Sequence, residues 1–378
     1  MKVLHVITGL GVGGAELQLR SILQQTRHNS DVVTLYNPGP VADMIRADGG
    51  RVRDIGMTRN TQLSALLRLR TLIRDGRYDV VHAHLYRSQV YGRAAAWLAG
   101  TPVVLSTEHS IGETHLERRR MTLSVRALYL GTEMLSDMTV AVSGTVRERL
   151  QKWGLRRKRV TVIPNGVDLQ RVAFDETARQ RIRAEFGVGD DVYLIGVLGR
   201  LDPNKQFDMV IEAASGLLSD KVKLMIVGKG EEQARLEQAA REHGVTNHVI
   251  FAGERHDVSA MLSAMDLFVA SSRQETFGLS VLEALANGAP VLYTTCPALD
   301  GLDAERACRV PSTADGIRAA MAAEVSAGQR QRITEPAVEK EYSVEAVTAR
   351  IDDLYERLAQ RKVWRTMWRP RTSTGSTR

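Results

Sequence analysis

Short aliphatic runs alternate with helix-prone segments along almost the whole chain. Such runs are typical of strands buried on both faces of a parallel sheet, with an amphipathic helix between successive strands. The sequence therefore predicts an α/β fold with doubly wound parallel sheets. The expected strands are Val3–Thr8, Asp31–Tyr36, Val80–Ala83, Val103–Ser106, Met138–Val142, Val160–Ile163, Tyr193–Leu198, Lys223–Val227, Val249–Ala252, Leu267–Ala270 and Val291–Tyr293.

This number of strands is too large for one sheet of this kind, so we expect two facing Rossmann-like domains. The turn cluster Pro164–Asp168 ends the first set of strands, and a polar helix over Glu176–Phe186 precedes the second set. The expected organisation is an N-terminal domain over residues 1–168 and a second domain over 169–345. A C-terminal helix and tail, residues 346–378, would cross back to the first domain.

The positive charge is concentrated in the first half. Residues 1–168 contain 24 Lys/Arg and 14 Asp/Glu, whereas the remainder contains 27 and 30. A basic domain favours an anionic partner, and since no nucleic-acid motif is present, a membrane surface or a phosphate-bearing acceptor is expected. The sequence has two cysteines and no evident secretory leader or apolar span, which favours a cytoplasmic protein. Peripheral contact at the inner face of the cell membrane is a further expectation.

The segment Ser271–Val291 combines two carboxylates with the start of a helix. Glu275 and Glu283 bracket the turn Phe277-Gly278-Leu279, which opens an apolar, helix-prone run over Leu279–Ala286. The free N–H groups and the dipole of a helix N-terminus attract phosphate, and carboxylates accept sugar hydroxyls. The segment therefore predicts a site for a sugar nucleotide.

Two cations, Arg200 and Lys205, lie in the loop that follows the expected strand Tyr193–Leu198. At the carboxyl end of a parallel strand, two cations can clamp a diphosphate. The alternative is an ordinary surface loop with solvated side chains. Because the same domain carries the expected phosphate-binding helix, we favour a functional role.

The first loop, Gly9–Gly14, matches the dinucleotide-binding pattern GxGxxG. That interpretation also requires an acid at the end of the second strand, whereas Asp31 stands at the start of that strand. The glycines still indicate a tight backbone turn, with Gly13 and Gly14 open to phosphate or acceptor. An NAD-dependent oxidoreductase and a ligand-free turn remain alternatives.

Three histidines follow strands of the first domain. His109 stands just beyond Val103–Ser106, where it would contact a sugar hydroxyl or the reaction centre. His82 and His84 resemble a metal pair, but no third ligand is evident nearby, so no metal is predicted. The cluster Arg118–Arg120, with Arg126, lies on a helix-prone segment, either as a solvated face or as a contact for membrane or acceptor.

The motifs together resemble the retaining glycosyltransferases of the GT-B fold, specifically family four. The resemblance extends from GLGVGGAE (Gly9–Glu16) to the strand near Val291. In the second half, GRLDPNK, IVGKGEE, VIFAGERHDV and two glutamates separated by seven residues occur in the family's order and spacing.

The resemblance implies a role for each matching residue. Glu275 would bind hydroxyls of the donor sugar and Glu283 the nucleotide ribose. Arg200 and Lys205 would hold the diphosphate together with the segment Thr276–Leu279, including the amides of Phe277, Gly278 and Leu279. Arg255 would lie near the base, His109 near the donor sugar, and Gly13 and Gly14 on the phosphate or acceptor side. His109, Arg200, Lys205 and Glu275 would be the catalytic group.

This chain departs from the family pattern in two places. Gln206 occupies the position after the loop lysine where the family usually has glycine. The segment Thr294–Leu302, TTCPALDGL, replaces a glycine-rich segment that often touches the donor, which leaves the donor's identity open.

The resemblance implies a hexosyltransferase that uses a nucleotide-diphosphate sugar, needs no metal or other cofactor, and acts on a glycan, a lipid-linked molecule or a small molecule. Polysaccharide, glycolipid or secondary-metabolite biosynthesis would fit. No residue stands out as a covalent nucleophile. Besides the oxidoreductase, a sugar-nucleotide epimerase and a non-catalytic sugar-nucleotide-binding scaffold remain alternatives.

Overall fold

The structure is a computed structural model that describes residues 1–112, 115–117, 119–328 and 331–367. Contacts divide it into two compact units. Unit 1 comprises Met1–Ile163 and the chain from Val347 onward, and unit 2 comprises Pro164–Ala346. The unit boundaries therefore come after Ile163 and Ala346, whereas the sequence predicted domain boundaries after residues 168 and 345.

Unit 1 contains a seven-stranded, fully parallel sheet with the order β3-β2-β1-β4-β5-β8-β9. A short antiparallel hairpin, β6-β7, follows β5. The strands are β1 (Lys2–Ile7), β2 (Asn29–Thr34), β3 (Arg51–Asp54), β4 (Val80–His84), β5 (Val103–Glu108), β6 (His115–Leu116), β7 (Arg119–Arg120), β8 (Met138–Ala141) and β9 (Val160–Val162).

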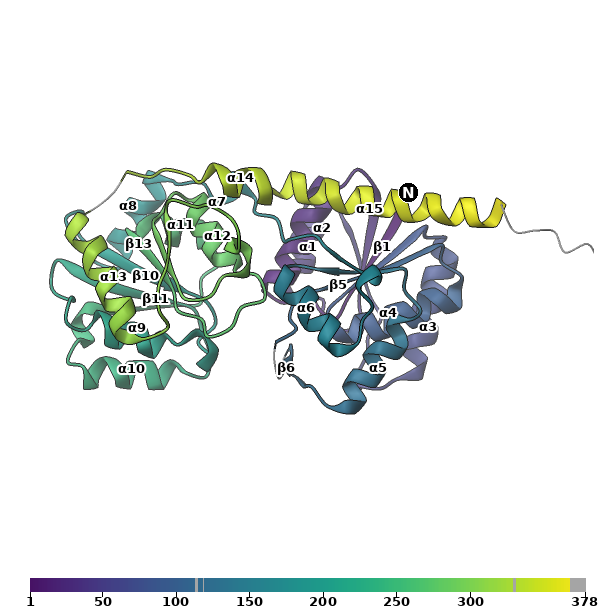
Figure 1. Cartoon of the computed structure of the whole chain (residues 1–378), viewed down its shortest axis with the longest axis horizontal. Helices are drawn as coiled ribbons and strands as arrows, with labels where there is room; N and C mark the ends of the chain where they lie inside the picture. Colours follow the sequence, from purple (N-terminus) through teal and green to yellow (C-terminus); the bar gives the residue numbers. More distant parts are fainter. Residues whose placement is uncertain (113–114, 118, 329–330, 368–378) are drawn as a thin grey trace, which may run out of the picture. The chain divides into compact units, whose positions relative to one another are not determined.

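Helices cover both faces of this sheet, as buried parallel strands require (Figure 1). Along β1, Leu4 and Val6 pack towards α3 and α4, while Val3 packs towards α1 and α15. Adjacent helices α3, α4 and α5 contact one another on the first of these faces. The helices are α1 (Gly14–Gln25), α2 (Gly39–Ala47), α3 (Leu63–Gly76), α4 (Tyr86–Ala99), α5 (Leu123–Glu133), α6 (Gly144–Trp153), the 3-10 turn η1 (Arg157–Arg159) and α15 (Val344–Met367).

Unit 2 contains a six-stranded parallel sheet with the order β12-β11-β10-β13-β14-β15. Its strands are β10 (Tyr193–Leu198), β11 (Val222–Val227), β12 (Val249–Gly253), β13 (Leu267–Ala270), β14 (Val291–Tyr293) and β15 (Ala307–Arg309). Its helices are α7 (Leu169–Val172), α8 (Glu176–Glu185), η2 (Pro203–Lys205), α9 (Phe207–Ala214), α10 (Gln233–Glu242), η3 (Thr246–His248), α11 (Val258–Ala264), α12 (Leu279–Ala286), η4 (Pro297–Leu299), α13 (Ala314–Ala327) and α14 (Pro336–Tyr342).

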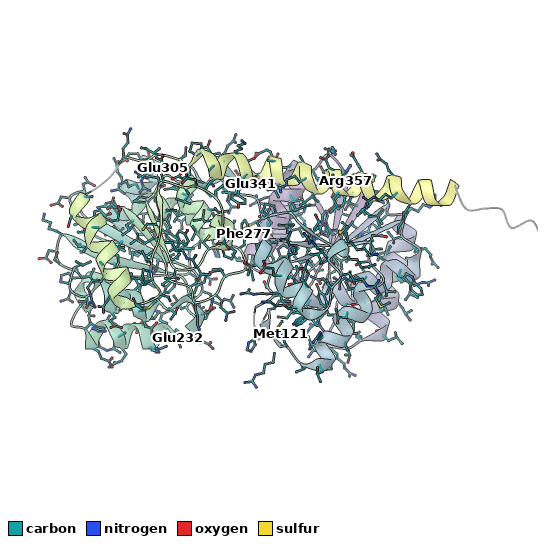
Figure 2. All side chains as sticks on the ribbon, viewed as in Figure 1. Met121, Glu232, Phe277, Glu305, Glu341 and Arg357 are labelled. Atoms are coloured by element: carbon teal, nitrogen blue, oxygen red, sulfur yellow. The ribbon has the colours of Figure 1, made fainter. Side chains whose placement is uncertain are left out.

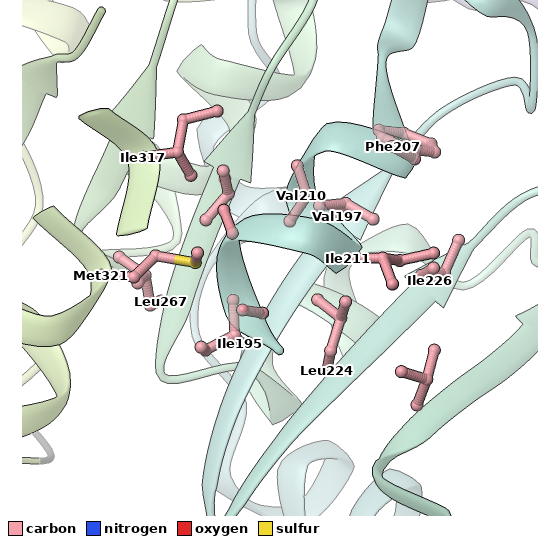
Figure 3. Packing of buried hydrophobic residues seen from close by; sticks show 14 of the residues in the cluster. Ile195, Val197, Phe207, Val210, Ile211, Leu224, Ile226, Leu267, Ile317 and Met321 are labelled. Carbon is pink, nitrogen blue, oxygen red and sulfur yellow. The ribbon is translucent and has the colours of Figure 1, made fainter. Parts of the chain in front are cut away.

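The core of unit 2 is aliphatic. Figure 3 shows Ile195 and Val197 of β10 beside Leu224 and Ile226 of β11, in one cluster with residues of α9 and α13. All four strand residues are at most 1% exposed. This packing fixes the carboxyl ends of β10 and β13, which are hydrogen-bonded neighbours. The loops after these two strands therefore meet at one edge of the sheet.

The predicted class and both doubly wound sheets are confirmed, and β10, β13 and β14 match the predicted residues. One local prediction is wrong: Arg119 and Arg120 form β7 rather than part of a helix, and only Arg126 lies on α5. Arg118 lies outside the described residues. No helix in the described part of the chain combines the length and apolar character needed to cross a bilayer.

Candidate functional site

Two neighbouring loops of unit 2 form the frame of the candidate site. One follows β10 and contains Arg200 and Lys205, and the other follows β13 and leads into α12. Asn204 joins them: its amide Nδ2 donates to the Gln274 carbonyl at 2.9 Å, and its Oδ1 accepts from the Gln274 N–H at 3.1 Å. The Ser271 hydroxyl donates to the Lys205 carbonyl at 2.6 Å. The loop carrying the cations is thus fastened to the loop carrying Glu275.

Lys205 and Glu275 form an ion pair at this junction. The Lys205 Nζ lies 2.7 Å from Glu275 Oε1, and each side chain is 21% exposed. Gly199 permits this arrangement, because a Cβ at that position would lie 3.2 Å from Lys205 Cε. The pair places a cation and a hydroxyl-accepting carboxylate side by side at the carboxyl edge of the sheet.

Gly278 sets the direction in which α12 starts. Val281 and Leu282 donate the first backbone bonds to the Gly278 carbonyl, so the N–H groups of Gly278, Leu279 and Ser280 precede the helical ladder. Gly278 has a φ of 102°, and a Cβ there would lie 2.4 Å from the buried Cys296 Sγ. Cys296 belongs to the Thr294–Leu302 segment, which therefore packs directly against this turn.

We predict that Gly278→Ala destabilises unit 2 by about 2–4 kcal/mol, because the side chain adds left-handed backbone strain to a clash with Cys296. Urea unfolding would measure the loss. Gly301→Ala is the matched control, since Gly301 also has a positive φ, 80°, but open space around its Cβ position. The double variant Gly278→Ala/Cys296→Ala should recover part of the loss. Equal losses in Gly278→Ala and Gly301→Ala would contradict the proposed clash.

Glu283 stands in the second turn of α12, half-buried. Burial raises the pKa of its carboxyl to about 7, and the positive charge of Arg171 only partly opposes this shift. A carboxyl in this state takes up or releases a proton near neutral pH and can exchange hydrogen bonds with a hydroxyl-bearing ligand.

The raised pKa of Glu283 predicts a pH dependence of stability. The unfolded carboxyl ionises near its model value of 4.5 and the folded one near 7, so the folded state binds more protons between these values. The contribution is therefore fully present below pH 4.5 and is lost as pH rises through 7, by at most about 3 kcal/mol. Glu283→Gln should flatten this slope in urea titrations. A variant as steep as the wild type would contradict the assignment.

The other predicted donor residues occupy distinct positions in unit 2. Arg200 is 56% exposed and lies 3.5 Å from Asp202. Arg255, after β12, is held by Glu185 at 2.6 Å and Asp257 at 2.8 Å. Phe277 is buried, with its ring edge-on to that of Tyr342 on α14, and precedes α12 in Figure 2. Thr276 and Leu279 are half-buried beside it.

The residue at the family's glycine position, Gln206, has a φ of 50°. Glycine adopts this left-handed conformation without steric cost, which accounts for the family preference. Gln206 still supports the start of α9 directly after η2. The departure therefore leaves the loop path intact.

In unit 1, Gly13 and Gly14 form the start of α1. Gly13 is its N-cap, and a Cβ there would lie 2.5 Å from Glu16 Oε2. The glycine thus lets Glu16 fold over the helix start. Asp31, the acid of β2, stands near the start of that strand and is engaged by Tyr78 at 2.7 Å and Arg51 at 2.9 Å. The oxidoreductase alternative therefore lacks an acid of β2 at the end of the strand as a ribose ligand.

His109 ends a row of buried imidazoles in unit 1. His84 Nδ1 lies 3.3 Å from His109 Nε2, and His84 Nε2 lies 3.1 Å from His5 Nδ1. Burial lowers the pKa of His5 and His109 to about 4 and that of His84 well below its usual range, so all three are neutral at pH 7. The remaining nitrogen, His109 Nδ1, is buried and has no partner among the described residues.

The row couples the tautomers of its members. A neutral imidazole has one donor and one acceptor nitrogen. If His84 donates to His5, His109 must donate to His84 and its Nδ1 is an acceptor. If the direction reverses, the His109 Nδ1–H is a donor. His5 therefore helps to decide which hydrogen bond His109 offers.

Sequence reasoning missed two residues around His109. His5, on β1, lies close enough to His82 and His84 that one nitrogen of each falls within 4.8 Å of the others, so the expectation that no third ligand lies nearby was wrong. A metal would have to displace a bond of His82, whose nitrogens contact Tyr355 at 2.6 Å and Thr107 at 2.7 Å. Glu108 is also buried, and burial raises its pKa to about 7.

Two family models and several named relatives match this chain. Residues 12–171 match the family model described as Glycosyltransferase Family 4, and residues 178–302 match Glycosyl transferases group 1. A D-inositol 3-phosphate glycosyltransferase of Geodermatophilus obscurus is 30% identical over 350 residues, covering 83% of this chain and 76% of that protein. The putative glycosyltransferase EpsF of Bacillus subtilis is 26% identical, covering 78% and 79%.

Among solved structures, Anabaena Alr3699/HepE in complex with UDP aligns with a TM-score of 0.81 at 20% identity, over 94% of this chain and all of that one. Sucrose-phosphate synthase from Thermosynechococcus elongatus aligns with a TM-score of 0.75 at 19% identity, over 96% of this chain and all of that one. These likenesses support the GT-B fold. The chain thus belongs to the family of glycosyltransferases that comprises the group 1 and family 4 enzymes.

Proposed function

We propose that this glycosyltransferase transfers a sugar from a nucleotide-diphosphate sugar to an acceptor, with retention at the anomeric carbon and without a metal. The observation that carries the proposal is the Lys205–Glu275 pair beside the start of α12. It combines a cation for a diphosphate, a carboxylate for sugar hydroxyls and backbone N–H groups for a phosphate.

In this proposal, positive groups stabilise the departing diphosphate. The positive electrostatic field comes from Lys205, Arg200 and the amides of Phe277, Gly278 and Leu279. Thr276 lies in the same segment as these amides. Glu275 accepts hydrogen bonds from the sugar and Glu283 from the ribose, and Arg255 lies towards the base. Charge stabilisation of this kind is a large part of the rate enhancement of many enzymes.

The proton chemistry would involve no covalent enzyme intermediate. The leaving phosphate takes the proton of the attacking acceptor hydroxyl as the new glycosidic bond forms on the same face of the sugar. His109, neutral at pH 7, offers its Nδ1 to a hydroxyl of the donor sugar. Gly13 and Gly14 leave the backbone near the start of α1 accessible to a phosphate or to the acceptor.

The acceptor is a glycan, a lipid-linked molecule or a small molecule. One relative is an Escherichia coli protein that is 28% identical over 239 residues, covering 61% of this chain and 62% of that protein. It is named as a galactosyltransferase acting on a diphosphoundecaprenol-linked sugar. Its name and the basic first half of this chain favour a lipid-linked acceptor in polysaccharide or glycolipid biosynthesis, with the enzyme in the cytoplasm and in peripheral contact with the membrane.

A screen of nucleotide sugars would test the proposal. The melting temperature should rise with UDP-, GDP- or ADP-sugars, and the stabilisation should grow with the logarithm of the ligand's excess over Kd. NMR of the product formed with the stabilising donor should show the donor's anomeric configuration, and EDTA should leave the rate unchanged. An inverted product would contradict retention, and loss of activity in EDTA would contradict metal independence.

The same measurements separate the alternatives. A sugar-nucleotide epimerase would convert the donor with no acceptor present. A scaffold would bind the donor and show no turnover with any acceptor. Absence of stabilisation by all nucleotide sugars would contradict the donor site itself.

A further inference from the structure

Helix α5 presents an apolar surface on the outside of unit 1. Leu123 is 83% exposed, Leu128 49% and Met134, directly after the helix, 75%. The opposite side of the helix is buried through Tyr129 and Glu133. α5 lies next to α4 in the layer of helices that covers one face of the sheet (Figure 1). Leu123, Leu128 and Met134 are thus three large apolar side chains left exposed on or next to one helix, which marks a surface for interaction.

Basic side chains border this apolar surface. Arg126 donates to the Trp153 carbonyl at 2.8 Å, and Arg159 contacts Glu133 at 2.8 Å, so the segment after α6 is held against α5. The end of α6 and this segment together carry four exposed cations, Lys152, Arg156, Arg157 and Lys158. Arg120 of β7 is also exposed.

Acidic side chains do little to neutralise this border. Between Arg119 and Arg159 the sequence has 10 Lys/Arg and 3 Asp/Glu. Glu133 is buried against Arg159, and Asp137 accepts from the Val104 N–H and from Lys362. Glu148 is the remaining acid of this stretch and is exposed. The border is therefore strongly positive.

We propose that α5 and the segment 152–158 dock on a bilayer of anionic lipids, with α5 lying in the membrane plane and its leucines and Met134 inserted. A helix with an apolar face and a basic border binds a membrane interface in two ways: its apolar side chains are buried in the bilayer, and its basic side chains are attracted to anionic lipids. Each basic side chain near an anionic surface strengthens binding about fivefold. A second copy of this chain is disfavoured as the occupant, because two such basic borders would repel each other.

The position of α5 ties the surface to the acceptor. His109 directly follows β5, and the chain runs through the β6-β7 hairpin into α5, which begins at that edge of the sheet. Met121, labelled in Figure 2, belongs to the segment that joins β7 to α5. A lipid-linked acceptor held at the membrane would therefore be presented beside His109. This inference rests on the proposed function for its acceptor, whereas docking itself requires no turnover.

Vesicle binding by the full chain tests the proposal. With Cys308→Ser as background, since Cys308 is the exposed cysteine and Cys296 is buried, a polarity-sensitive dye is attached at Leu128→Cys. Its emission should shift to the blue with vesicles of phosphatidylglycerol and phosphatidylcholine, but not with phosphatidylcholine alone. The same dye at Ile333→Cys, which is 52% exposed in unit 2, should not shift.

Variants then separate the two contributions. In cosedimentation, Leu123→Ser/Leu128→Ser/Met134→Ser should weaken binding at least tenfold. Arg156→Glu/Arg157→Glu/Lys158→Glu should weaken it more than a hundredfold at low salt. Ile333→Ser should bind like the wild type, and wild-type binding should weaken as salt rises.

Several outcomes would overturn docking: no binding of the wild type to anionic vesicles, equal binding of the triple serine variant, or a dimer that this variant dissociates. Thermal shift with the donor sugar is measured on every variant. Donor stabilisation without vesicle binding defeats only the membrane proposal. Vesicle binding without donor stabilisation defeats only the proposed function.

Discussion

Replacing Lys205 with alanine should lower kcat by about 10²–10³-fold, because it removes a positive group from the position proposed for the leaving diphosphate. The substitution should lower kcat more than it raises KM, since negative charge on the diphosphate grows as the glycosidic bond breaks. Stability should change by at most about 1 kcal/mol, because both members of the ion pair with Glu275 are 21% exposed and partly solvated.

The matched control is Lys221→Ala. Lys221 also pairs with a carboxylate, Asp191, but it precedes β11 and so lies at the opposite edge of the same sheet. It should retain the wild-type kcat. Lys205→Arg keeps the charge and should recover part of the lost rate, although a guanidinium is larger and directs its donors differently. Wild-type turnover in Lys205→Ala, or an equal loss in Lys221→Ala, would rule out the proposed role.

Most of the fold could be predicted because the buried strands carry their own signal. Runs such as Tyr193–Leu198 and Leu267–Ala270 are apolar throughout, and the structure places β10 and β13 at these residues. Besides the hairpin strands β6 and β7, two short strands of the parallel sheets were missed. β3 reads RVRD with most of its side chains exposed, and β15 has only three residues at the end of its sheet. Such edge strands are specified by their neighbours more than by their own composition.

The candidate site likewise has parts that could be predicted from the sequence and parts that could not. Lys205 and Glu275 could be brought together from the sequence, because the loops after two adjacent parallel strands meet at one edge. The lack of room for a Cβ at Gly278 beside Cys296 could not, since it depends on the path of the Thr294–Leu302 segment. His5 was missed for a related reason. It reaches His84 only through the pairing of β1 with β4, across 79 residues of sequence.

Replacing Asp266 with alanine should destabilise unit 2 by about 3–5 kcal/mol. This carboxylate is 6% exposed and binds two arginines of α8, with Arg179 at 2.7 Å and Arg183 at 3.3 Å. It also accepts the Leu194 N–H at 2.8 Å, at the start of β10. Alanine would leave two guanidinium groups close together, one of them fully buried, with no carboxylate to compensate them.

Exposed and buried pairs of the same unit can be compared directly. Asp191→Ala breaks the exposed pair with Lys221 and should leave stability almost unchanged, because water screens both side chains. Because two units need not unfold together, hydrogen exchange of β10 and β13 reports the loss more directly than a single melting temperature. Faster exchange in these strands for Asp266→Ala, with unit 1 unchanged, is the expected result. If Asp266→Ala exchanged no faster than Asp191→Ala, the arginines would be adequately solvated without the carboxylate. The aliphatic core alone would then have to stabilise the frame that holds the loops of Lys205 and Glu275.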